Sequence, residues 1–254
     1  MRFSSKSDSE ILLRLYQRQG LEATLPLLRG EFAFALFDRA EDCLYLVRDR
    51  FGIKPQYWAM TPEGLVFGSE LKVLFAHPAV ERRFTSEGLF HQLMQTMVPG
   101  TTAFAGVHQV KPGHVLKVQR AQGQLEVSEW SYWDLNFPRK DERDQSLSEA
   151  DHVAAVRAAL LEAVELRMVA DVPVGCYLSG GIDSCSILGL ASAVSQSPVR
   201  AFTIGFDDAR YDESPIAQEM AEATGAEQDV MRLSGRELYG FMERTLWHAE
   251  RTIY

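Results

Sequence analysis

The feature that most constrains the fold of this chain is a Ser-Gly-Gly turn between an apolar run and a helical pattern. The apolar run 172–178 predicts a buried strand, and residues 184–194 predict the helix after it. Beyond this helix we expect strands at 199–206 and 229–233, a helix from Ser214 that Gly225 ends, and a last helix from Ser234. Strands joined by helices of this length form a parallel sheet. The second half of the chain therefore predicts the first three strands of an α/β domain.

The first half of the chain has a different pattern. Residues 32–37 and 44–47 flank one polar turn, and residues 56–60 and 65–68 flank another, which predicts two hairpins. We expect the four strands to form one antiparallel meander, and the apolar first strand predicts burial on both of its faces. A capping box at 7–10, with the Ser7 hydroxyl accepting from the Glu10 amide, predicts a preceding helix that ends at Gly20. The first half therefore predicts an α+β domain.

A charged segment with few apolar residues, 135–147, separates the two patterns and predicts a linker. We therefore expect a first domain at 1–134 and a second at 148–254. The second opens with a helix capped by Ser148, and this helix has one apolar stripe along residues 153–164. A helical pattern begins close to the first residue and the parallel sheet has few strands, so we expect an internal piece of a longer chain. Such a piece would have exposed strand edges and uncovered apolar faces.

Composition excludes several classes of protein. A net charge of −9 over 254 residues leaves no basic stripe for a nucleic-acid backbone, so we expect no nucleic-acid partner. No apolar run is long enough for a membrane helix, and no apolar signal core follows the first residues, so we expect an untargeted chain. Three scattered cysteines do not make a disulfide framework or a zinc site, and the six histidines form no metal-binding pair. We therefore expect an ordinary globular protein of the reducing cytoplasm, with no membrane partner.

The turn at 179–184, Ser-Gly-Gly-Ile-Asp-Ser, carries the chemistry. Its glycines and the following helix N-terminus predict an anion site, and Asp183 would repel a bare phosphate unless Mg²⁺ bridges the two. The turn lacks the lysine and the spacing of the loop that handles β/γ cleavage, which favours release of pyrophosphate and transfer of AMP. The alternative is a glycine turn that only lets the strand and the helix pack closely.

These residues resemble the glutamine-hydrolysing asparagine synthetases. The synthetase likeness lies in 171–175 and 178–184, and the glutaminase likeness in 48–57, 68–72, 104–107, 111–113 and 132–133. The resemblance implies an α+β region followed by an α/β region: part of an αββα N-terminal-nucleophile glutaminase domain, then the start of a parallel-sheet adenine-nucleotide domain of the pyrophosphate-loop type.

The resemblance also implies an activity. In this family glutamine is hydrolysed to ammonia in the first domain, and the ammonia passes through a tunnel to the second. There it attacks β-aspartyl-AMP, which forms from aspartate and ATP with release of pyrophosphate. The implied cofactors are ATP and Mg²⁺, the implied substrates are aspartate, glutamine and ATP, and the full-length enzyme could form a homodimer.

Site residues carry over by matching position. The resemblance implies contacts to ATP or pyrophosphate from Leu178, Ser179, Gly180, Gly181, Asp183, Ser184 and Ile204, with Asp183 reaching Mg²⁺ through the phosphates. Asp8 matches the acid that pairs with the α-amino group of glutamine, and the alternative is an acid that serves its helix dipole. Asp207-Asp208 could contact Mg²⁺ or form a solvated loop, and Glu250 could line the synthetase cleft.

The chain departs from the family at the glutaminase nucleophile. That nucleophile is an N-terminal cysteine with its own amine as base, whereas this chain begins Met1-Arg2-Phe3. Cys43, Cys176 and Cys185 are predicted core residues, so we assign no catalytic residue and expect this chain alone to be inactive. Two alternatives stay open: a related synthetase that adenylates another carboxylate, and a catalytically silent ATP-binding module.

Overall fold

The computed structural model describes residues 3–96, 98–142 and 146–251. Met1, Arg2, Met97 and 143–145 of the predicted linker lie outside the described residues. The chain divides into two compact units, one of residues 1–137 with 246–254 and one of residues 138–245. The first unit contains α1 (Asp8–Thr24), η1 (Leu25–Leu27), β1 (Ala33–Asp38), β2 (Cys43–Arg48), β3 (Tyr57–Thr61), β4 (Gly64–Gly68), α2 (Leu71–Leu74), α3 (Ser86–Leu93), β5 (Val107–Gln109), β6 (His114–Ala121) and β7 (Gln124–Ser131).

The strands of the first unit form two antiparallel sheets, ordered β1-β2-β6-β7 and β4-β3-β5. Both predicted hairpins are confirmed, with β1 paired to β2 and β3 paired to β4. The expected single meander is wrong, because β2 pairs with β6 while β3 pairs with β5 in the other sheet. The sequence analysis also missed β7, which follows β6 through a turn at Gln122 and Gly123, both with positive φ. Such a turn next to alternating apolar residues is the signal for a hairpin.

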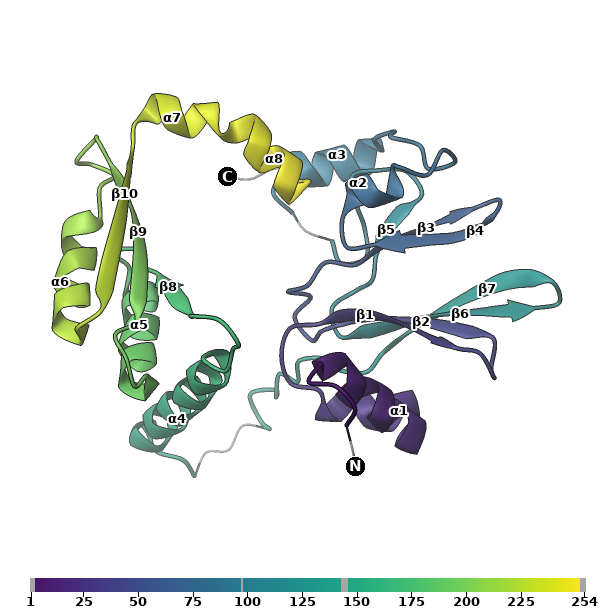
Figure 1. The fold of residues 1–254 in the computed structure, drawn as a ribbon, viewed down its shortest axis with the longest axis horizontal. Helices are drawn as coiled ribbons and strands as arrows, with labels where there is room; N and C mark the ends of the chain where they lie inside the picture. Colours follow the sequence, from purple (N-terminus) through teal and green to yellow (C-terminus); the bar gives the residue numbers. More distant parts are fainter. Residues whose placement is uncertain (1–2, 97, 143–145, 252–254) are drawn as a thin grey trace. The chain divides into compact units, whose positions relative to one another are not determined.

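Three core clusters show that the first unit has four layers (Figure 1). Helix α1 and η1 pack through Leu21 and Leu25 on Val47 and Val115 of the first sheet. The two sheets pack face to face around Leu46, Leu116 and Val118, with Trp58 and Leu65 of the second sheet against them. Helix α2 covers the far side of the second sheet through Leu71 and Leu74. The order helix, sheet, sheet, helix confirms the expected αββα arrangement.

Strand β1 is covered on one face only, which corrects the expected burial on both faces. Leu36 is buried, whereas Ala35 and Phe37 of the opposite face are exposed. The reason is that β1 lies at the edge of its sheet, beside β2 alone. Its apolar run therefore reflects strand propensity as well as burial.

Arg48 explains why the chain leaves the first sheet after β2. Its side chain is buried and donates hydrogen bonds to three main-chain carbonyl oxygens, those of Lys54 (2.9 Å), Gly52 (2.6 Å) and Val110 (2.9 Å). Burial lowers the pKa of Arg48. One guanidinium therefore joins the end of β2 to the segments that enter and leave the second sheet.

Asp49 stabilises the same loop by accepting hydrogen bonds from its main-chain amides. It is 1% exposed, and its carboxylate accepts from the amides of Phe51 (3.1 Å), Ile53 (3.0 Å) and Lys54 (3.0 Å). Gly52 has φ +64°, and a Cβ there would lie 2.9 Å from both Arg48 and Pro112. Only glycine fits a position that is both left-handed and so crowded.

Two later segments that resemble the glutaminase, 111–113 and 132–133, contact the loop that follows β2. Gly113 donates to the main chain of Asp49 (2.9 Å), and the Tyr132 hydroxyl donates to the main chain of Arg48 (2.8 Å). A Cβ at Gly113 would lie 2.4 Å from the carbonyl oxygen of Trp133. Segments far apart in the sequence therefore form one junction, which we call the Arg48–Asp49 junction.

The second unit contains α4 (Glu149–Arg167), β8 (Gly175–Tyr177), α5 (Ile182–Val194), β9 (Arg200–Phe206), α6 (Ser214–Thr224), β10 (Glu227–Leu233) and α7 (Gly235–Gly240), and α8 (Met242–Ala249) begins in it. Its strands form the expected parallel sheet, ordered β10-β9-β8. Helices α5 and α6 cover one face, where Leu188 and Ala217 pack on Ala201. Gly225 ends α6 in the left-handed conformation, as predicted.

The other face of this sheet is uncovered in the described residues, in agreement with the expectation of open apolar surface. Phe202 is 38% exposed, Ile204 52% and Met231 62%. The predicted apolar stripe of α4 is buried only at Val164, while Val153 and Val156 are exposed, so the stripe is not a core face here. No helix of the described residues is both long and apolar enough to cross a bilayer.

The Arg48–Asp49 junction generates a stability prediction. Asp49→Asn replaces one acceptor oxygen by a donor that faces main-chain amides, so we expect the free energy of unfolding of the first unit to fall by about 3 kcal/mol. All four tryptophans lie in this unit, so their fluorescence during a urea titration measures the effect. Asp141→Asn, an exposed change in the linker, is the matched control. Equal unfolding midpoints for the two variants would contradict the prediction.

Candidate functional site

The Ser-Gly-Gly turn lies at the carboxyl end of the parallel sheet, where β8 leads into α5 (Figure 1). The Leu178 amide donates to the carbonyl oxygen of Phe202 (2.8 Å), which extends the pairing of β8 with β9 to the first residue of the turn. Gly181 is the N-cap of α5 and has extended backbone angles. Ligands of open α/β sheets bind at this end of the strands, and the α5 N-terminus adds amides and a positive dipole.

Two serines hold the turn closed. The Ser179 amide donates to Ser184 Oγ (3.2 Å), and the two hydroxyl oxygens lie 2.9 Å apart. Ser184 Oγ also lies 3.1 Å from the carbonyl oxygens of Ser179 and Gly181, and the Gly181 amide donates to Ser179 Oγ (3.3 Å). The serines predicted as phosphate ligands therefore also fix the shape of the turn.

Gly180 is the point where α6 approaches the turn. Its amide donates to Oε2 of Glu213, the N-cap residue of α6 (3.0 Å). A Cβ at Gly180 would lie 3.1 Å from Glu213 Cβ and 3.2 Å from Ile216 Cβ. A side chain here would crowd the start of α6, and the sequence analysis did not foresee the Glu213 contact.

The structure brings six of the seven predicted nucleotide residues together in one stretch, Leu178 to Ser184. Leu178 is 2% exposed and packs in the core, so its main chain is the part that a ligand could reach. Asp183 is exposed in the first turn of α5. Ile204, from β9, is half exposed on the open face of the sheet. These contacts to ATP stay predictions.

Metal ligands are sparse around the turn. Among the described residues, no group of three or more His, Cys, Asp or Glu side chains could hold a metal ion. Asp208, in the loop after β9, is bound instead to Arg210 (2.6 Å), whose hydrogen bonds lower the pKa of that carboxyl. A Mg²⁺ ion here would therefore take most of its ligands from phosphates and water, with Asp183 as the nearby carboxylate.

Asp8 lies at a separate cavity in the first unit. This cavity has a volume of about 580 Å³, and its polar lining includes Asp8, Ser9, Arg29, Glu31, Lys54 and Ser69. Lys54 Nζ lies 3.2 Å from Glu31 Oε2. Lys54 and Ser69 belong to the segments of the glutaminase likeness, which is the signal that could have placed them beside Asp8. The cavity offers both signs of charge, as a zwitterionic amino acid requires.

The chain before Asp8 is held by Glu10. Its carboxylate accepts from the Ser4 amide (2.9 Å), which is the first cause of a pKa lowered from 4.5 to about 2, and from the hydroxyl and the amide of Ser5 (both 2.7 Å). The expected capping box is therefore wrong. Ser7 caps α1 by accepting from Ser9 (3.3 Å), while Glu10 binds the turn before the cap. Gly20 interrupts the helix with φ +78°, and a further turn continues to Thr24.

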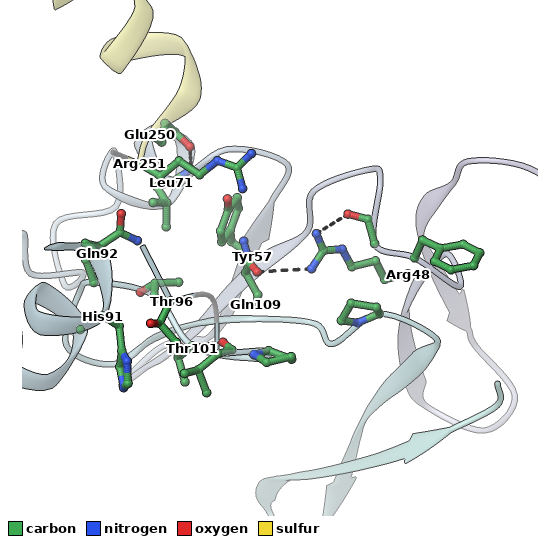
Figure 2. Close-up of a pocket in the computed structure, with 18 residues that line it drawn as sticks. Arg48, Tyr57, Leu71, His91, Gln92, Thr96, Thr101, Gln109, Glu250 and Arg251 are labelled. Atoms are coloured by element: carbon green, nitrogen blue, oxygen red, sulfur yellow. Dashed lines mark hydrogen bonds between the residues drawn. The ribbon is translucent and has the colours of Figure 1, made fainter. Parts of the chain in front are cut away.

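A smaller cavity of about 140 Å³ lies near the Arg48–Asp49 junction (Figure 2). Figure 2 shows the Arg48 guanidinium beside Gln109, with Tyr57, His91 and Thr101 among the residues around the cavity. Its lining is mixed in polarity and includes Leu71 and the last described residues, Glu250 and Arg251. The sequence analysis did not foresee this cavity.

Glu250 binds the N-terminus of α2. Its carboxylate accepts from the amides of Leu71 (2.5 Å) and Lys72 (2.8 Å), and Lys72 Nζ lies 3.3 Å from Oε1. The same ammonium lies 5.5 Å from the centre of the Trp247 ring. Glu250 has φ +55°, a conformation that non-glycine residues rarely adopt without support. The structure places Glu250 in the first compact unit, and a role in a synthetase cleft stays a prediction.

The Glu10 contact predicts a pH dependence. A lowered carboxyl pKa stabilises the folded turn at pH values above the ordinary pKa, and this stabilisation is lost as the pH falls from about 4.5 through about 2. We expect the Ser4 and Ser5 amide resonances to shift with a midpoint near 2 in an NMR titration, and Glu10→Gln to remove this transition. Glu22→Gln, on the same helix, should leave it unchanged. A wild-type midpoint near 4.5 would contradict the contact.

The Glu250 contact predicts a local change in hydrogen exchange. Amides in the first turn of a helix have no partner within the helix. Glu250→Ala should therefore speed exchange at Leu71 and Lys72 by roughly tenfold to hundredfold, the equivalent of one charge-assisted hydrogen bond. Glu243→Ala, on α8, is the control. Unchanged exchange at both amides in Glu250→Ala would show that the contact does not form in solution.

Comparisons with known families match the two halves of the chain to different models. Residues 1–133 match the family model described as a glutamine amidotransferase domain. Residues 155–254 match the model described as asparagine synthase. The first match contains the Asp8 cavity, and the second contains the Ser-Gly-Gly turn.

Individual relatives extend over nearly the whole chain. The amidase chry2 of Gibberella zeae is 35% identical over 98% of this chain and 38% of its own length. Asparagine synthetase 1 (glutamine-hydrolyzing) of Bacillus subtilis is 34% identical over 97% of this chain and 37% of its own length. Asparagine synthetase 3 (glutamine-hydrolyzing) of the same organism is 30% identical over 96% of this chain and 41% of its own length. The chain thus spans about two fifths of the length of these curated relatives.

A solved structure of glutamine phosphoribosylpyrophosphate amidotransferase from B. subtilis covers 91% of this chain and 40% of its own. The TM-score is 0.36 at 17% sequence identity, a likeness too low to support an argument. The two family models and the relatives carry the assignment. The chain therefore belongs to the glutamine-hydrolysing asparagine synthetase family, with a glutamine amidotransferase domain followed by an asparagine synthase domain.

Proposed function

We propose that this chain is part of an ATP-dependent enzyme that forms an amide. In this proposal the second unit binds ATP·Mg²⁺ and takes part in activating aspartate as β-aspartyl-AMP, with release of pyrophosphate. Ammonia from glutamine then attacks the activated carboxyl carbon, and AMP leaves. Aspartate, glutamine and ATP are the small-molecule substrates.

The observation that carries the proposal is the strand, turn and helix at 175–194. The edge strand β8 ends at the carboxyl end of a parallel sheet, and the Ser-Gly-Gly turn leads directly into the N-terminus of a 13-residue helix. This strand is exposed at Gly175 and Tyr177, which corrects the expected burial of the run 172–178. No lysine follows the glycines, so nothing in the turn is directed at a γ-phosphate. This donor set suits a triphosphate that loses pyrophosphate as a unit.

The Asp8 cavity supports the glutamine side of the proposal. Its carboxylates suit an α-amino group, and Lys54 and Arg29 suit a carboxylate. The chemistry of hydrolysis needs a thiolate nucleophile. None of the three cysteines lines the Asp8 cavity, and Cys185 lies on α5 of the second unit. Cys43 is buried, and burial raises the pKa of the Cys43 and Cys176 thiols, which disfavours the thiolate. We therefore propose that this chain binds glutamine without hydrolysing it.

One finding favours a second candidate function. The relative from Gibberella zeae is named an amidase, and its identity to this chain is similar to that of asparagine synthetase 1. A related enzyme that acts on another carboxylate or amide would use the same Ser-Gly-Gly turn. Replacement of aspartate by other acids in a pyrophosphate-exchange assay separates the two candidates.

Binding of ATP by calorimetry, with and without Mg²⁺, tests the proposal. We expect the wild type to bind ATP·Mg²⁺ and Asp183→Asn to bind it about tenfold more weakly, because one carboxylate near the bridging cation is lost. In the absence of Mg²⁺, Asp183→Asn should bind ATP at least as tightly as the wild type does, because the substitution removes a negative charge that repels the phosphates. Asp229→Asn, on β10, is the control.

The outcomes are distinct. Absence of ATP·Mg²⁺ binding in the wild type would refute the proposed nucleotide site. Binding without aspartate-dependent pyrophosphate exchange, measured in the longest protein that contains this chain, would favour a silent ATP-binding module. Exchange with aspartate alone among the acids would support the asparagine synthetase reaction.

A further inference from the structure

We propose that Glu213 is an internal ligand of the Ser-Gly-Gly turn, and that its carboxylate occupies the Gly180 amide until a phosphate of the nucleotide displaces it. The inference rests on the proposed ATP site and adds a residue that lowers the affinity of that site. Glu213 lies outside the predicted nucleotide-binding residues and comes from α6, the next helix along the chain.

The Gly180 amide differs from its neighbours in the turn because its hydrogen-bond acceptor comes from outside the turn. The Ser179 and Gly181 amides both donate to serine hydroxyls that belong to the turn itself. The Gly180 amide instead donates 3.0 Å to the carboxylate of a separate helix. This amide is therefore already engaged by an anion, and the anion is part of the protein.

A carboxylate and a phosphate cannot share this position. Both accept hydrogen bonds from main-chain amides, and two negative groups at contact distance repel each other. Binding of a nucleotide phosphate at Gly180 therefore requires that the Glu213 side chain move away. The hydrogen bond between Glu213 and the Gly180 amide is lost when the nucleotide binds, and this loss lowers the affinity for the nucleotide.

The side chain of Glu213 can move without unfolding α6. Glu213 is exposed, and its contact to the turn is a single hydrogen bond. The start of α6 is held independently, because Asp212 accepts from the Ser214 amide (3.1 Å) and lies 3.5 Å from Arg232. Ser214 is buried, which fixes the helix against the sheet. Rotation of one side chain is then sufficient to open the Gly180 amide.

The experiment compares nucleotide affinity in Glu213→Gln and in the wild type. The glutamine keeps the size of the side chain and removes the charge, so we expect ATP·Mg²⁺ to bind about tenfold more tightly. Glu213→Ala removes the acceptor altogether and should give at least the same gain. Glu219→Gln, an exposed residue of the same helix, has the same change of net charge and should alter the affinity less than twofold.

A second measurement needs no nucleotide. The Gly180 amide should exchange with solvent faster in Glu213→Ala than in the wild type, because its acceptor is gone. In the wild type, addition of ATP·Mg²⁺ should shift the side-chain carboxylate carbon resonance of Glu213. These readouts report the contact and its displacement separately from the affinity.

Each outcome has one meaning. Tighter binding in both Glu213 variants, with Glu219→Gln unchanged, supports the displacement. Equal or weaker binding in Glu213→Gln, while the wild type binds, overturns this inference and leaves the ATP site standing. If none of the four proteins binds ATP·Mg²⁺, the proposed function fails and the inference fails with it. An equal gain in Glu219→Gln would assign the effect to net charge and overturn the inference.

Discussion

The buried side chains of Arg48 and Asp49 are the constraint on which the first unit depends. Three main-chain carbonyl groups accept from the guanidinium, and three main-chain amides donate to the carboxylate. Burying two charges is costly unless their polar atoms are satisfied, and here adjacent loops satisfy them. These loops connect the two sheets, so the junction fixes how the chain passes from one sheet to the other. The Asp8 cavity takes part of its wall from the same loop, at Lys54 and Pro55.

The second unit depends on a different constraint, the close approach of neighbouring side chains to the main chain of its glycines. Gly175 leaves room for the Phe202 ring, and Gly180 leaves room for the start of α6. A Cβ at Gly180 would require the start of α6 to shift by a few tenths of an ångström. The glycines therefore serve packing, in agreement with the alternative interpretation of the turn, and the proposed ligand binding is a second role. Close packing and hydrogen bonding coexist at Gly180, because Glu213 packs against this glycine and also accepts from its amide.

The sequence predicted the local elements better than their assembly. Both hairpins, the parallel sheet and the left-handed end of α6 follow from nearby residues and are confirmed. The single meander is wrong because β2 pairs with β6, which lies far along the chain and which no local pattern relates to β2. At the site, residues 178–184 are contiguous and could be predicted together. The contacts of Glu213, Glu250 and Lys54 could not, since each joins segments that no local pattern relates.

Many carboxylates of this chain accept hydrogen bonds from main-chain amides, and four of them, Asp49, Glu250, Glu10 and Glu213, differ in a way that bears on the proposed function. Asp49 is buried with three amide donors, and Glu250 is held by two amides and an ammonium. Glu10 binds the amides and the hydroxyls of two serines. Glu213 alone of these four is exposed with a single amide donor, and that donor belongs to the Ser-Gly-Gly turn. A carboxylate with several donors is held more firmly than one with a single donor at the surface. The number of donors, more than the type of residue, therefore distinguishes the other three carboxylates from Glu213, which we propose that a phosphate displaces.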